Sequence, residues 1–279
     1  MSLERVGLIA GGGDLPFHVA EEAASRGYEV VAIAFPGFTS PEMDDRVAET
    51  LWLKLGQLDA AIAALKSRGI NRVVMAGKIE KSNLMTIWNL RPDRRALRLV
   101  RSLNDWRDDT ILAGIAAELL KDGIVVEEIT AWATKLMAEI GVLTRRSPSE
   151  SQWRDITFGR QMALGIGSLD IGQTVVVKNA AVVAVEAIEG TDRAILRAGE
   201  LGIADSVVVK MAKPNQDMRF DVPGVGPKTI EAMVRAKARV LAVEAGKTMI
   251  TRRAEMVHYA NRADIVVVGI PASGPPDRS

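Results

Sequence analysis

The sequence predicts an α/β protein of two α/β domains, an N-terminal doubly wound, Rossmann-like sheet and a C-terminal domain with a mixed sheet. Short Val- and Ile-rich runs alternate with helical segments along the chain. Of the 279 residues, 48% are hydrophobic and only 4% are aromatic, a composition that suits helices layered on a parallel sheet. We predict domains at 1–130 and 151–279, joined by a linker at 131–150, where the polar stretch "TRRSPSE" contains a proline.

The first half shows the expected alternation most clearly. A tight glycine turn separates its first strand from its first helix, and Asp14 is a plausible N-cap of that helix. The predicted elements are a strand at 5–10, a helix at 15–26, a strand at 28–35, a helix at 58–68, a strand at 71–77, a helix at 106–122 and a strand at 124–130. This order predicts right-handed crossovers and a mostly parallel sheet.

The second half adds a hairpin to the same alternation. "TVVVKNAAVVAVEAIEG" reads as two strands joined by a short turn. The other predicted elements are helices from about 153, 191 and 227, and strands at 206–213, 239–246, 248–250 and 263–270. An antiparallel hairpin beside strands separated by helices predicts a mixed sheet.

Composition excludes several classes of protein. With 36 basic and 35 acidic residues, the net charge of +1 does not supply the positive field that supports non-specific DNA affinity. The chain has no cysteine, which excludes disulfides and thiolate metal sites, and its two histidines are far apart in sequence. No run approaches the roughly 18 apolar residues of a membrane span. Because the N-terminal "MSLERVGLIAGGG" lacks a signal-peptide pattern, we expect a cytoplasmic protein.

The stretch "LIAGGGDLP" is the first candidate ligand site. Gly11, Gly12 and Gly13 lie between a strand and a helix, where backbone N–H groups can cradle a phosphate. Pro16 breaks the dinucleotide fingerprint G-x-G-x-x-G, and no P-loop lysine follows. The alternative is a tight turn that needs glycine. Lys78 follows the next central strand and could meet a phosphate at the same sheet edge, or be an ordinary surface lysine.

Two acidic segments of the second half carry further candidates. "VEAIEGTDRAI" gathers Glu186, Glu189 and Asp192 around the turn Gly190–Thr191, where they could bind Mg²⁺ or a sugar, although helix capping explains part of the pattern. "KMAKPNQDMRFD" combines cations with carboxylates, as phosphoryl chemistry requires, and the alternative is a solvated loop. Its polar residues are Lys210, Lys213, Gln216, Asp217, Arg219 and Asp221. If this segment were an extended strand, the side chains of Asp217, Arg219 and Asp221 would lie on one face of it.

The stretch "VPGVGPKTI" at 222–230 resembles the hairpin of a DNA-binding helix-hairpin-helix. That motif needs a helix before the hairpin, whereas "DMRFD" reads as extended. A simpler interpretation is that Gly224 and Gly226 open a helix at Pro227. A nucleic-acid-binding module and a non-catalytic nucleotide- or NAD-binding regulator are the two alternatives to an enzyme.

Several motifs together resemble a known family. They are "GLIAGGGDLP", "AGK", "LDIGQTVVV", "VAVEAIEGTD", "KPNQDMRFDVPGVGPKTI" and "AVEAG", in this order along nearly the whole chain. They are similar to signatures of the UDP-2,3-diacylglucosamine pyrophosphatases of the non-calcineurin type, which act in lipid A biosynthesis. The resemblance implies two α/β domains and Mg²⁺-dependent hydrolysis of UDP-2,3-diacylglucosamine to UMP and 2,3-diacylglucosamine 1-phosphate (lipid X).

The resemblance also suggests which residues act. The critical aspartate of the family falls on Asp221, and we predict Asp217 and Arg219 as its catalytic neighbours. The predicted Mg²⁺ ligands are Asp221, Glu189 and Asp192. The predicted substrate-binding residues are Gly11, Gly12, Gly13, Lys78, Gln173, Gly190, Thr191, Lys210, Lys213 and Gln216.

The lipid part of such a substrate needs an apolar contact. Leu84, Met85, Ile87 and Trp88 could line an acyl groove or meet the inner membrane peripherally, although ordinary core packing explains them equally well. From the habit of the family we expect a homodimer, and we expect no nucleic-acid partner.

Overall fold

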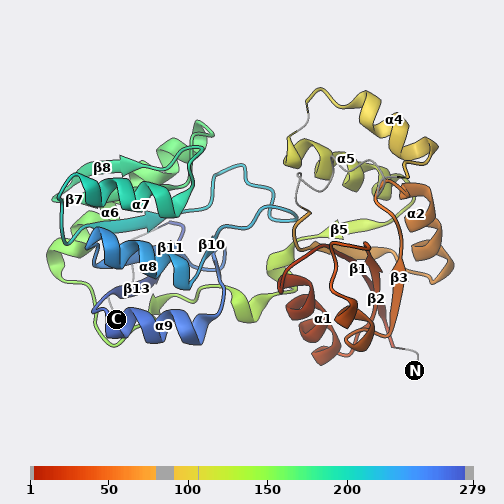
Figure 1. Ribbon diagram of the computed structural model, residues 1–279, viewed down its shortest axis with the longest axis horizontal. Coiled ribbons are helices and arrows are strands. Elements are labelled where there is room, and N and C mark those ends of the chain that lie inside the picture. Colours follow the sequence, from red (N-terminus) through yellow and green to blue (C-terminus); the bar gives the residue numbers. More distant parts are fainter. Residues whose placement is uncertain (1–2, 80–90, 106, 274–279) are drawn as a thin grey trace. The chain divides into compact units, whose positions relative to one another are not determined.

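The protein divides into two compact units (Figure 1). The computed structural model describes residues 3–79, 91–105 and 107–273, so the predicted acyl groove at 84–88 lies outside the described residues. Unit 1 comprises Met1–Ala133 together with Asp217–Asp221, and unit 2 comprises Thr134–Gln216 with Val222–Ser279. The short segment Asp217–Asp221 therefore belongs to the first unit although the second unit supplies the chain on both sides of it.

Unit 1 contains a five-stranded, fully parallel sheet in the order β3-β2-β1-β4-β5. Its strands are β1 (Arg5–Ala10), β2 (Glu29–Ala34), β3 (Glu49–Trp52), β4 (Arg72–Ala76) and β5 (Val125–Glu127). This order confirms the predicted doubly wound, Rossmann-like sheet. The sequence did not predict β3, because this edge strand is short and its exposed and half-buried residues give no apolar run.

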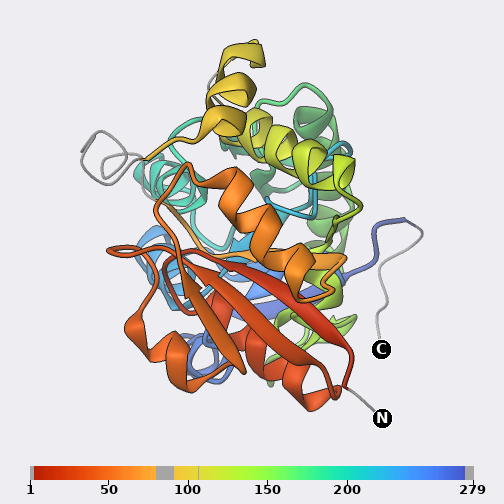
Figure 2. The same cartoon turned by 90° about the vertical axis from the view of Figure 1, so that its right-hand side faces the viewer.

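Helices cover both faces of this sheet (Figure 2). Within the described residues, the helices of unit 1 are α1 (Leu15–Ser25), α2 (Leu58–Ser67), α4 (Arg94–Ser102) and α5 (Asp108–Lys121). Because side chains alternate along a strand, Val31 and Val73 enter one core with Leu65 of α2 and Leu119 of α5. Helix α1 contacts β1, β2 and β4 with its own buried residues, which include Val19.

Unit 2 contains a mixed six-stranded sheet in the order β6-β13-β11-β9-β7-β8, as predicted. Strands β9, β11 and β13 are parallel, whereas β6 and β7 run antiparallel to their neighbours. The strands are β6 (Gly141–Val142), β7 (Thr174–Lys178), β8 (Ala181–Val185), β9 (Val207–Lys210), β11 (Val240–Glu244) and β13 (Val266–Ile270). Strand β6 lies within the range 131–150 for which we predicted a linker, so part of that range belongs to the sheet of unit 2.

The predicted hairpin is formed by β7 and β8. Its turn residues Asn179 and Ala180 both have a positive φ, as a two-residue hairpin turn of type I′ requires. The buried carboxylate of Asp155 on helix α6 (Glu150–Ser168) accepts hydrogen bonds from both of their amides, at 3.1 and 2.7 Å. A side chain from the covering helix thus fixes the turn.

Each face of the unit 2 sheet has its own core. Helix α6 (Glu150–Ser168) packs against Val177 and Val209 on one face. Helices α7 (Thr191–Glu200), α8 (Pro227–Ala236) and α9 (Arg253–Arg262) cover the other face. Gly159 allows α6 to approach closely, because a Cβ atom there would lie 2.6 Å from Val209 Cγ2.

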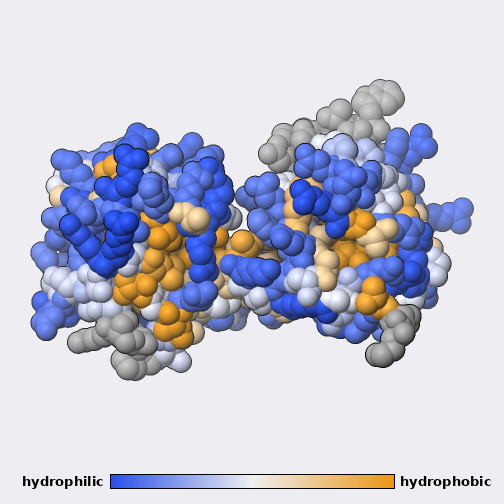
Figure 3. Space-filling model, turned by 90° about the horizontal axis from the view of Figure 1, so that it is seen from below, coloured by the Kyte–Doolittle hydropathy of each residue, from blue (hydrophilic) through white to orange (hydrophobic). Residues whose placement is uncertain are grey.

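On the face shown in Figure 3, the described residues of both units are mainly hydrophilic, with separate apolar patches. Among the described residues, we find no helix that combines the length and the hydropathy needed to cross a bilayer.

Candidate functional site

The first candidate site lies at the carboxyl edge of the unit 1 sheet, where the loops after β1 and β4 touch. The Gly11 amide donates to the Ala76 carbonyl at 2.7 Å, and Gly12 and Lys78 exchange two backbone hydrogen bonds of 2.8 and 3.0 Å. A Cβ atom on Gly11 would lie 2.9 Å from the Lys78 carbonyl oxygen and equally close to the Gly77 carbonyl carbon. Glycine is needed here because two backbones meet.

This contact corrects the predicted phosphate cradle. The amides of Gly11 and Gly12 are already bonded to protein carbonyls, so an interpretation as three open N–H donors is wrong for two of the three glycines. Gly13 differs, because it has φ +88° and a Cβ atom there would meet nothing within 4 Å. Contact with a ligand at this turn therefore falls to Gly13 and to the exposed Lys78 on the neighbouring loop.

The segment Asp217–Asp221 is attached to the same edge of unit 1. The Ile129 amide, two residues beyond β5, donates to the Met218 carbonyl at 3.2 Å. The Phe220 side chain packs against the unit 1 core that contains Val31 and Leu65. Since β1, β4 and β5 are parallel neighbours, Asp221 is held on the edge that also carries the glycine turn, where doubly wound sheets bind ligands.

The backbone of this segment is a turn. The amides of Phe220 and Asp221 donate to the Asp217 carbonyl at 3.1 and 3.0 Å. Asp217, Arg219 and Asp221 therefore do not alternate along a strand, and the shared face that an extended chain would give them is absent.

Asp217 and Arg219 bind each other. Arg219 Nε and Nη2 donate to the two carboxylate oxygens of Asp217 at 2.9 and 2.6 Å, a bidentate geometry. The hydrogen bond from Arg219 lowers the pKa of Asp217 below its usual value, and the Arg219 guanidinium also lies 4.8 Å from the Phe220 ring centroid. A carboxylate held in this way is a weak base, so the pair fits a positioning role better than the predicted catalytic one.

The second candidate site lies at the corresponding edge of unit 2 and contains a buried lysine. Lys210, the last residue of β9, is only 3% exposed, and its Nζ donates to Thr191 Oγ1 at 2.7 Å. Thr191 donates in turn to Glu186 Oε1 at 2.9 Å, and Glu186 is itself 6% exposed. A buried ammonium requires such a network, because its desolvation is otherwise costly. The structure thus brings Lys210 of one motif together with Glu186 and Thr191 of another at the start of α7.

Glu244, at the end of β11, holds the turn after β9. Its carboxylate is 1% exposed and accepts from the Ala212 amide at 2.8 Å and from Lys247 Nζ at 3.0 Å. Lys213 follows in that turn and pairs with Asp170 at 2.6 Å. The Gln216 side chain accepts from the Lys213 amide at 2.9 Å, so it closes the turn.

The remaining predicted ligand-binding residues of unit 2 lie beside this network. The Gln173 backbone accepts from the Met211 amide at 3.0 Å, next to β9, and the buried Gln173 Oε1 has no hydrogen-bond partner within the described part of the chain. Gly190 precedes α7 with φ +84°. Its amide donates to the Ala187 carbonyl at 3.3 Å, so glycine supplies a backbone conformation there.

The predicted metal ligands are divided between the two units. Asp221 belongs to unit 1, whereas Glu189 and Asp192 belong to unit 2. Both carboxylate oxygens of Glu189 are engaged, one by Arg197 at 2.6 Å and the other by the Ala187 amide at 3.1 Å. The hydrogen bond from Arg197 lowers the pKa of Glu189. Across the ranges that the structure describes, no group of three or more His, Asp or Glu side chains could hold a metal ion.

The stretch at 222–230 forms no helix-hairpin-helix. Residues 211–226, all of them described, contain no helix. Gly224–Val225 is a short strand, β10, paired in parallel with β12 (Met249–Ile250), and α8 then begins at Pro227. Gly226 is required by packing, because a Cβ atom there would lie 2.4 Å from Thr251 Oγ1.

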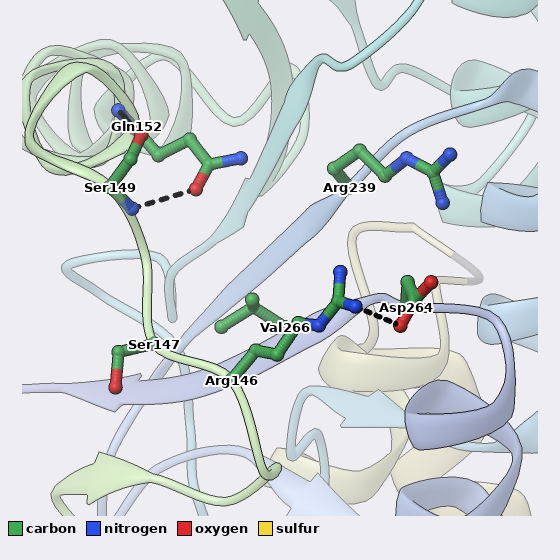
Figure 4. A pocket seen from close by; sticks show the side chains of 7 residues that line it. All are labelled: Arg146, Ser147, Ser149, Gln152, Arg239, Asp264 and Val266. Carbon is green, nitrogen blue, oxygen red and sulfur yellow. Dashed lines mark hydrogen bonds and ion pairs between the residues drawn. The ribbon is translucent and has the colours of Figure 1, made fainter.

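A further cavity of about 370 Å³ lies at the opposite edge of the unit 2 sheet (Figure 4). Arg239 and Val266 at the amino ends of β11 and β13 line it, with Arg146 and Asp264 paired at 3.0 Å. Ligands of parallel sheets bind at the carboxyl ends of the strands, and this cavity contains none of the predicted site residues.

Sequence reasoning missed Phe220 and Glu244, which hold the two loops in place. Glu244 gave a signal, since a lone acid at the end of the Val-rich run "VLAVE" repeats the pattern of Glu186 in "VVAVE". Phe220 gave none, because a phenylalanine in a polar loop does not indicate which core it enters.

Fold and sites together define an α/β protein with polar, partly charged loops at the carboxyl edges of a fully parallel sheet in unit 1 and of the parallel strands of a mixed sheet in unit 2, an arrangement typical of proteins that bind phosphorylated ligands. The model of the LpxI N-terminal domain matches residues 5–136, and the model of the LpxI C-terminal domain matches residues 139–268. The UDP-2,3-diacylglucosamine pyrophosphatase LpxI of Caulobacter vibrioides is 31% identical over 96% of this chain and 98% of its own. The chain belongs to the LpxI family.

Two solved structures match the chain at low sequence identity. A UDP-glucose-4-epimerase from Stenotrophomonas maltophila with bound NAD matches at 9% identity and a TM-score of 0.31, over 44% of this chain and 35% of its own. The precorrin-6A reductase CobK matches at 12% identity and a TM-score of 0.27, over 99% of this chain and 91% of its own.

Proposed function

We propose that this protein hydrolyses the diphosphate of UDP-2,3-diacylglucosamine, releasing UMP and 2,3-diacylglucosamine 1-phosphate (lipid X) in lipid A biosynthesis. The observation that carries the proposal is that both units match the LpxI family and that a named pyrophosphatase aligns over nearly the whole chain. The geometry adds a carboxylate, Asp221, held at a sheet edge where phosphorylated ligands bind.

Asp221 is the acid to which we assign the chemistry. Hydrolysis of a phosphoanhydride needs a group that orients or deprotonates the attacking water. Asp217 is neutralised by Arg219 in a bidentate pair, and the critical aspartate of the family falls on Asp221, so we assign that task to Asp221. The turn Asp217–Asp221 and the packing of Phe220 fix the position of this carboxylate on unit 1.

Cationic residues at the edge of unit 2 are suited to the charge of the diphosphate. Lys210 is oriented by Thr191 and Glu186, so little conformational freedom is lost when it meets a phosphoryl oxygen. Lys213 lies three residues further on, in the turn that Glu244 holds. We assign Lys210 to binding the phosphate of the acylated sugar. Lys213 would bind the same phosphate, for which its ammonium would leave its exposed partner Asp170.

We further propose that Mg²⁺ binds together with the substrate. Mg²⁺ is commonly held by one or two carboxylates plus substrate phosphates, which fits a chain whose described residues lack a three-ligand group. Asp221 would be its protein ligand, and the ion would neutralise charge on the phosphoryl oxygens. Isothermal titration checks this point: Mg²⁺ alone should bind weakly, and its affinity should rise when UMP is present.

Exposed aliphatic side chains on unit 2 are suited to the acyl chains at a membrane surface. Leu169 and Ile171 precede Gly172, and Ile188 follows Glu186; all three are exposed, Ile188 fully. The two loops touch, because a Cβ atom on Gly172 would lie 2.0 Å from the Glu186 carbonyl oxygen. These loops adjoin the Lys210 network, so we propose a cytoplasmic protein that meets the inner membrane peripherally here.

Sedimentation with vesicles tests this contact. Replacing Leu169, Ile171 and Ile188 by serine should reduce binding to vesicles that contain the lipid substrate and should raise KM more than it lowers kcat. Leu120→Ser, on the exposed side of α5 in unit 1, is the matched control and should behave like the wild type. Whether the protein is a homodimer stays a prediction, which light scattering would decide.

The experiment that tests the proposed activity is UMP release from UDP-2,3-diacylglucosamine by the purified protein. We expect release with Mg²⁺, little with EDTA, and a large loss in Asp221→Ala. A folded wild-type protein that releases no UMP would refute the proposed function.

A further inference from the structure

A cavity of about 770 Å³ lies at the carboxyl edge of unit 1, beside the glycine turn. Its volume is in the range of small-molecule pockets. The loop after β2, the 3₁₀ helix η1 (Pro41–Asp45), Phe17 of α1 and Trp52 at the end of β3 line it, with Gly13 and Asp14 at its mouth. None of the side chains assigned above to catalysis or to phosphate binding lies inside it.

The wall of this cavity is held rigidly. The buried Thr39 hydroxyl donates to the Ala10 carbonyl at 2.5 Å and accepts from the Phe35 amide at 2.9 Å, which ties the loop after β2 to the end of β1. A Cβ atom on Gly12 would lie 3.0 Å from the Phe38 carbonyl oxygen, so the glycine turn packs against the same loop. Met43 of η1 is completely buried beneath it. A site built on fixed elements loses little entropy when it binds a ligand.

The cavity combines an oriented aromatic ring with carboxylates. Trp52 is 37% exposed, and its indole Nε1 donates to Asp44 Oδ1 at 3.0 Å, which fixes the orientation of the ring. Glu42 and Asp14 add two more carboxylates to the lining. Carboxylates repel a phosphate and offer no favourable contact to an acyl chain. They do accept hydrogen bonds from hydroxyl and ring N–H groups. An aromatic face stacks a nucleobase.

We propose that this cavity binds the uridine part of the substrate, with uracil stacked on Trp52 and the ribose hydroxyls donating to the carboxylates of Asp44 and Glu42. The first phosphate would then leave the cavity past Gly13 toward Lys78, away from the carboxylates of Asp44 and Glu42. This inference rests on the proposed function, because it identifies where the nucleotide of that substrate binds. The site departs from a dinucleotide fold, in which an acid near the end of β2 binds the ribose, since Phe35, Pro36 and Gly37 follow β2 here.

Equilibrium binding of UMP tests the proposal without turnover. UMP should bind the wild-type full-length protein and quench its tryptophan fluorescence. Trp52→Ala should weaken UMP binding by ~10-fold or more, as expected for loss of one base–aromatic stack, and Trp52→Phe should weaken it less while abolishing most of the quenching. Asp44→Ala should weaken uridine and UMP alike, because the ribose contact is common to both. Leu120→Ala, an exposed change on another element of unit 1, should bind UMP like the wild type.

Two results would overturn the proposal. One is a UMP affinity that is equal in the wild type, Trp52→Ala and Asp44→Ala. A wild-type protein that binds no UMP would overturn the proposal in the same way. The other is Trp52 quenching by 2,3-diacylglucosamine 1-phosphate and not by UMP, which would assign the cavity to the acylated product. Release of UMP by the wild type is measured in parallel. If turnover is present while the Trp52 and Asp44 variants keep wild-type UMP affinity and KM, the uridine site fails and the proposed function stands.

Discussion

The two units present similar sheet edges but stabilise their charged groups differently. In unit 2 the key cation, Lys210, is buried and held by side chains of its own unit, Thr191 and Glu186. In unit 1 the key acid, Asp221, arrives on a five-residue segment whose neighbours in the chain belong to unit 2. The difference teaches that an active residue is assigned to a domain by the contacts of its segment, which here are the hydrogen bond from the Ile129 amide to the Met218 carbonyl and the packing of the Phe220 side chain on the core.

The largest expected effect separates the two acids of the segment. Asp221→Asn should lower kcat by ~1000-fold or more, the range for a group that acts on the reacting water together with a metal. Asp217→Asn should lower kcat far less, because Asp217 is neutralised by Arg219 and only orients the turn. Steady-state UMP release measures both. Equal losses in the two variants would contradict the division of roles.

The next effect tests the buried network of unit 2. Lys210→Met should lower kcat/KM by ~100-fold, and it should destabilise the protein by roughly 3 kcal/mol because it removes the ammonium from a buried network that still contains the Glu186 carboxylate. Adding Glu186→Gln should restore much of the stability without restoring activity. Urea unfolding, followed by circular dichroism, gives the free energies of unfolding. If the double variant is no more stable than Lys210→Met, charge pairing is not what holds this network.

A smaller effect tests the attachment of the segment to unit 1. Phe220→Ala should lower kcat by roughly 10- to 30-fold, since a loosely held carboxylate spends less time in the productive position, whereas KM should change little. Phe220→Leu keeps most of the apolar contact and should recover most of the rate. Loss of substrate affinity with unchanged kcat would mean that Phe220 contacts the substrate and does not position Asp221.

The smallest effect concerns pH. Because Arg219 lowers the pKa of Asp217 in the folded protein, the pair contributes stability above the unfolded pKa of about 3.9 and loses it as the pH falls through the lower folded value. Both side chains are about one third exposed, so the contribution should be at most ~1 kcal/mol. The stability difference between wild type and Asp217→Asn should be constant from pH 6 to 8 and should shrink below about pH 4. A difference that grows in acid would contradict this sign.

Much of the fold followed from local patterns. Val- and Ile-rich runs ending at glycine turns predicted most strands of both sheets, and the hairpin in "TVVVKNAAVVAVEAIEG" was predicted, although only the structure places its turn at Asn179–Ala180. The edge strands β3 and β6 were not predicted, because a short strand with one neighbour buries too few side chains to leave an apolar run in the sequence.

The sites were less accessible to sequence reasoning. Residue types indicated that Lys210, Thr191 and Glu186 belong to a polar site, but only the fold shows that they form one hydrogen-bonded chain. The role of Gly11 and Gly12 was misjudged, since a glycine needed for backbone contact looks the same in sequence as one needed for a phosphate. The attachment of Asp217–Asp221 to unit 1 depends on a tertiary contact of Phe220, which no local pattern encodes.

The measurement that tests the central claim most directly is amide hydrogen exchange at Ile129 in the active wild-type protein. If the segment that carries Asp221 is held on unit 1, the Ile129 amide should exchange slowly, it should remain protected in the inactive Asp221→Asn variant, and it should lose protection in Phe220→Ala. Fast exchange at Ile129 in a fully active wild-type protein would contradict the account, because Asp221 would then act without being held at the edge of unit 1.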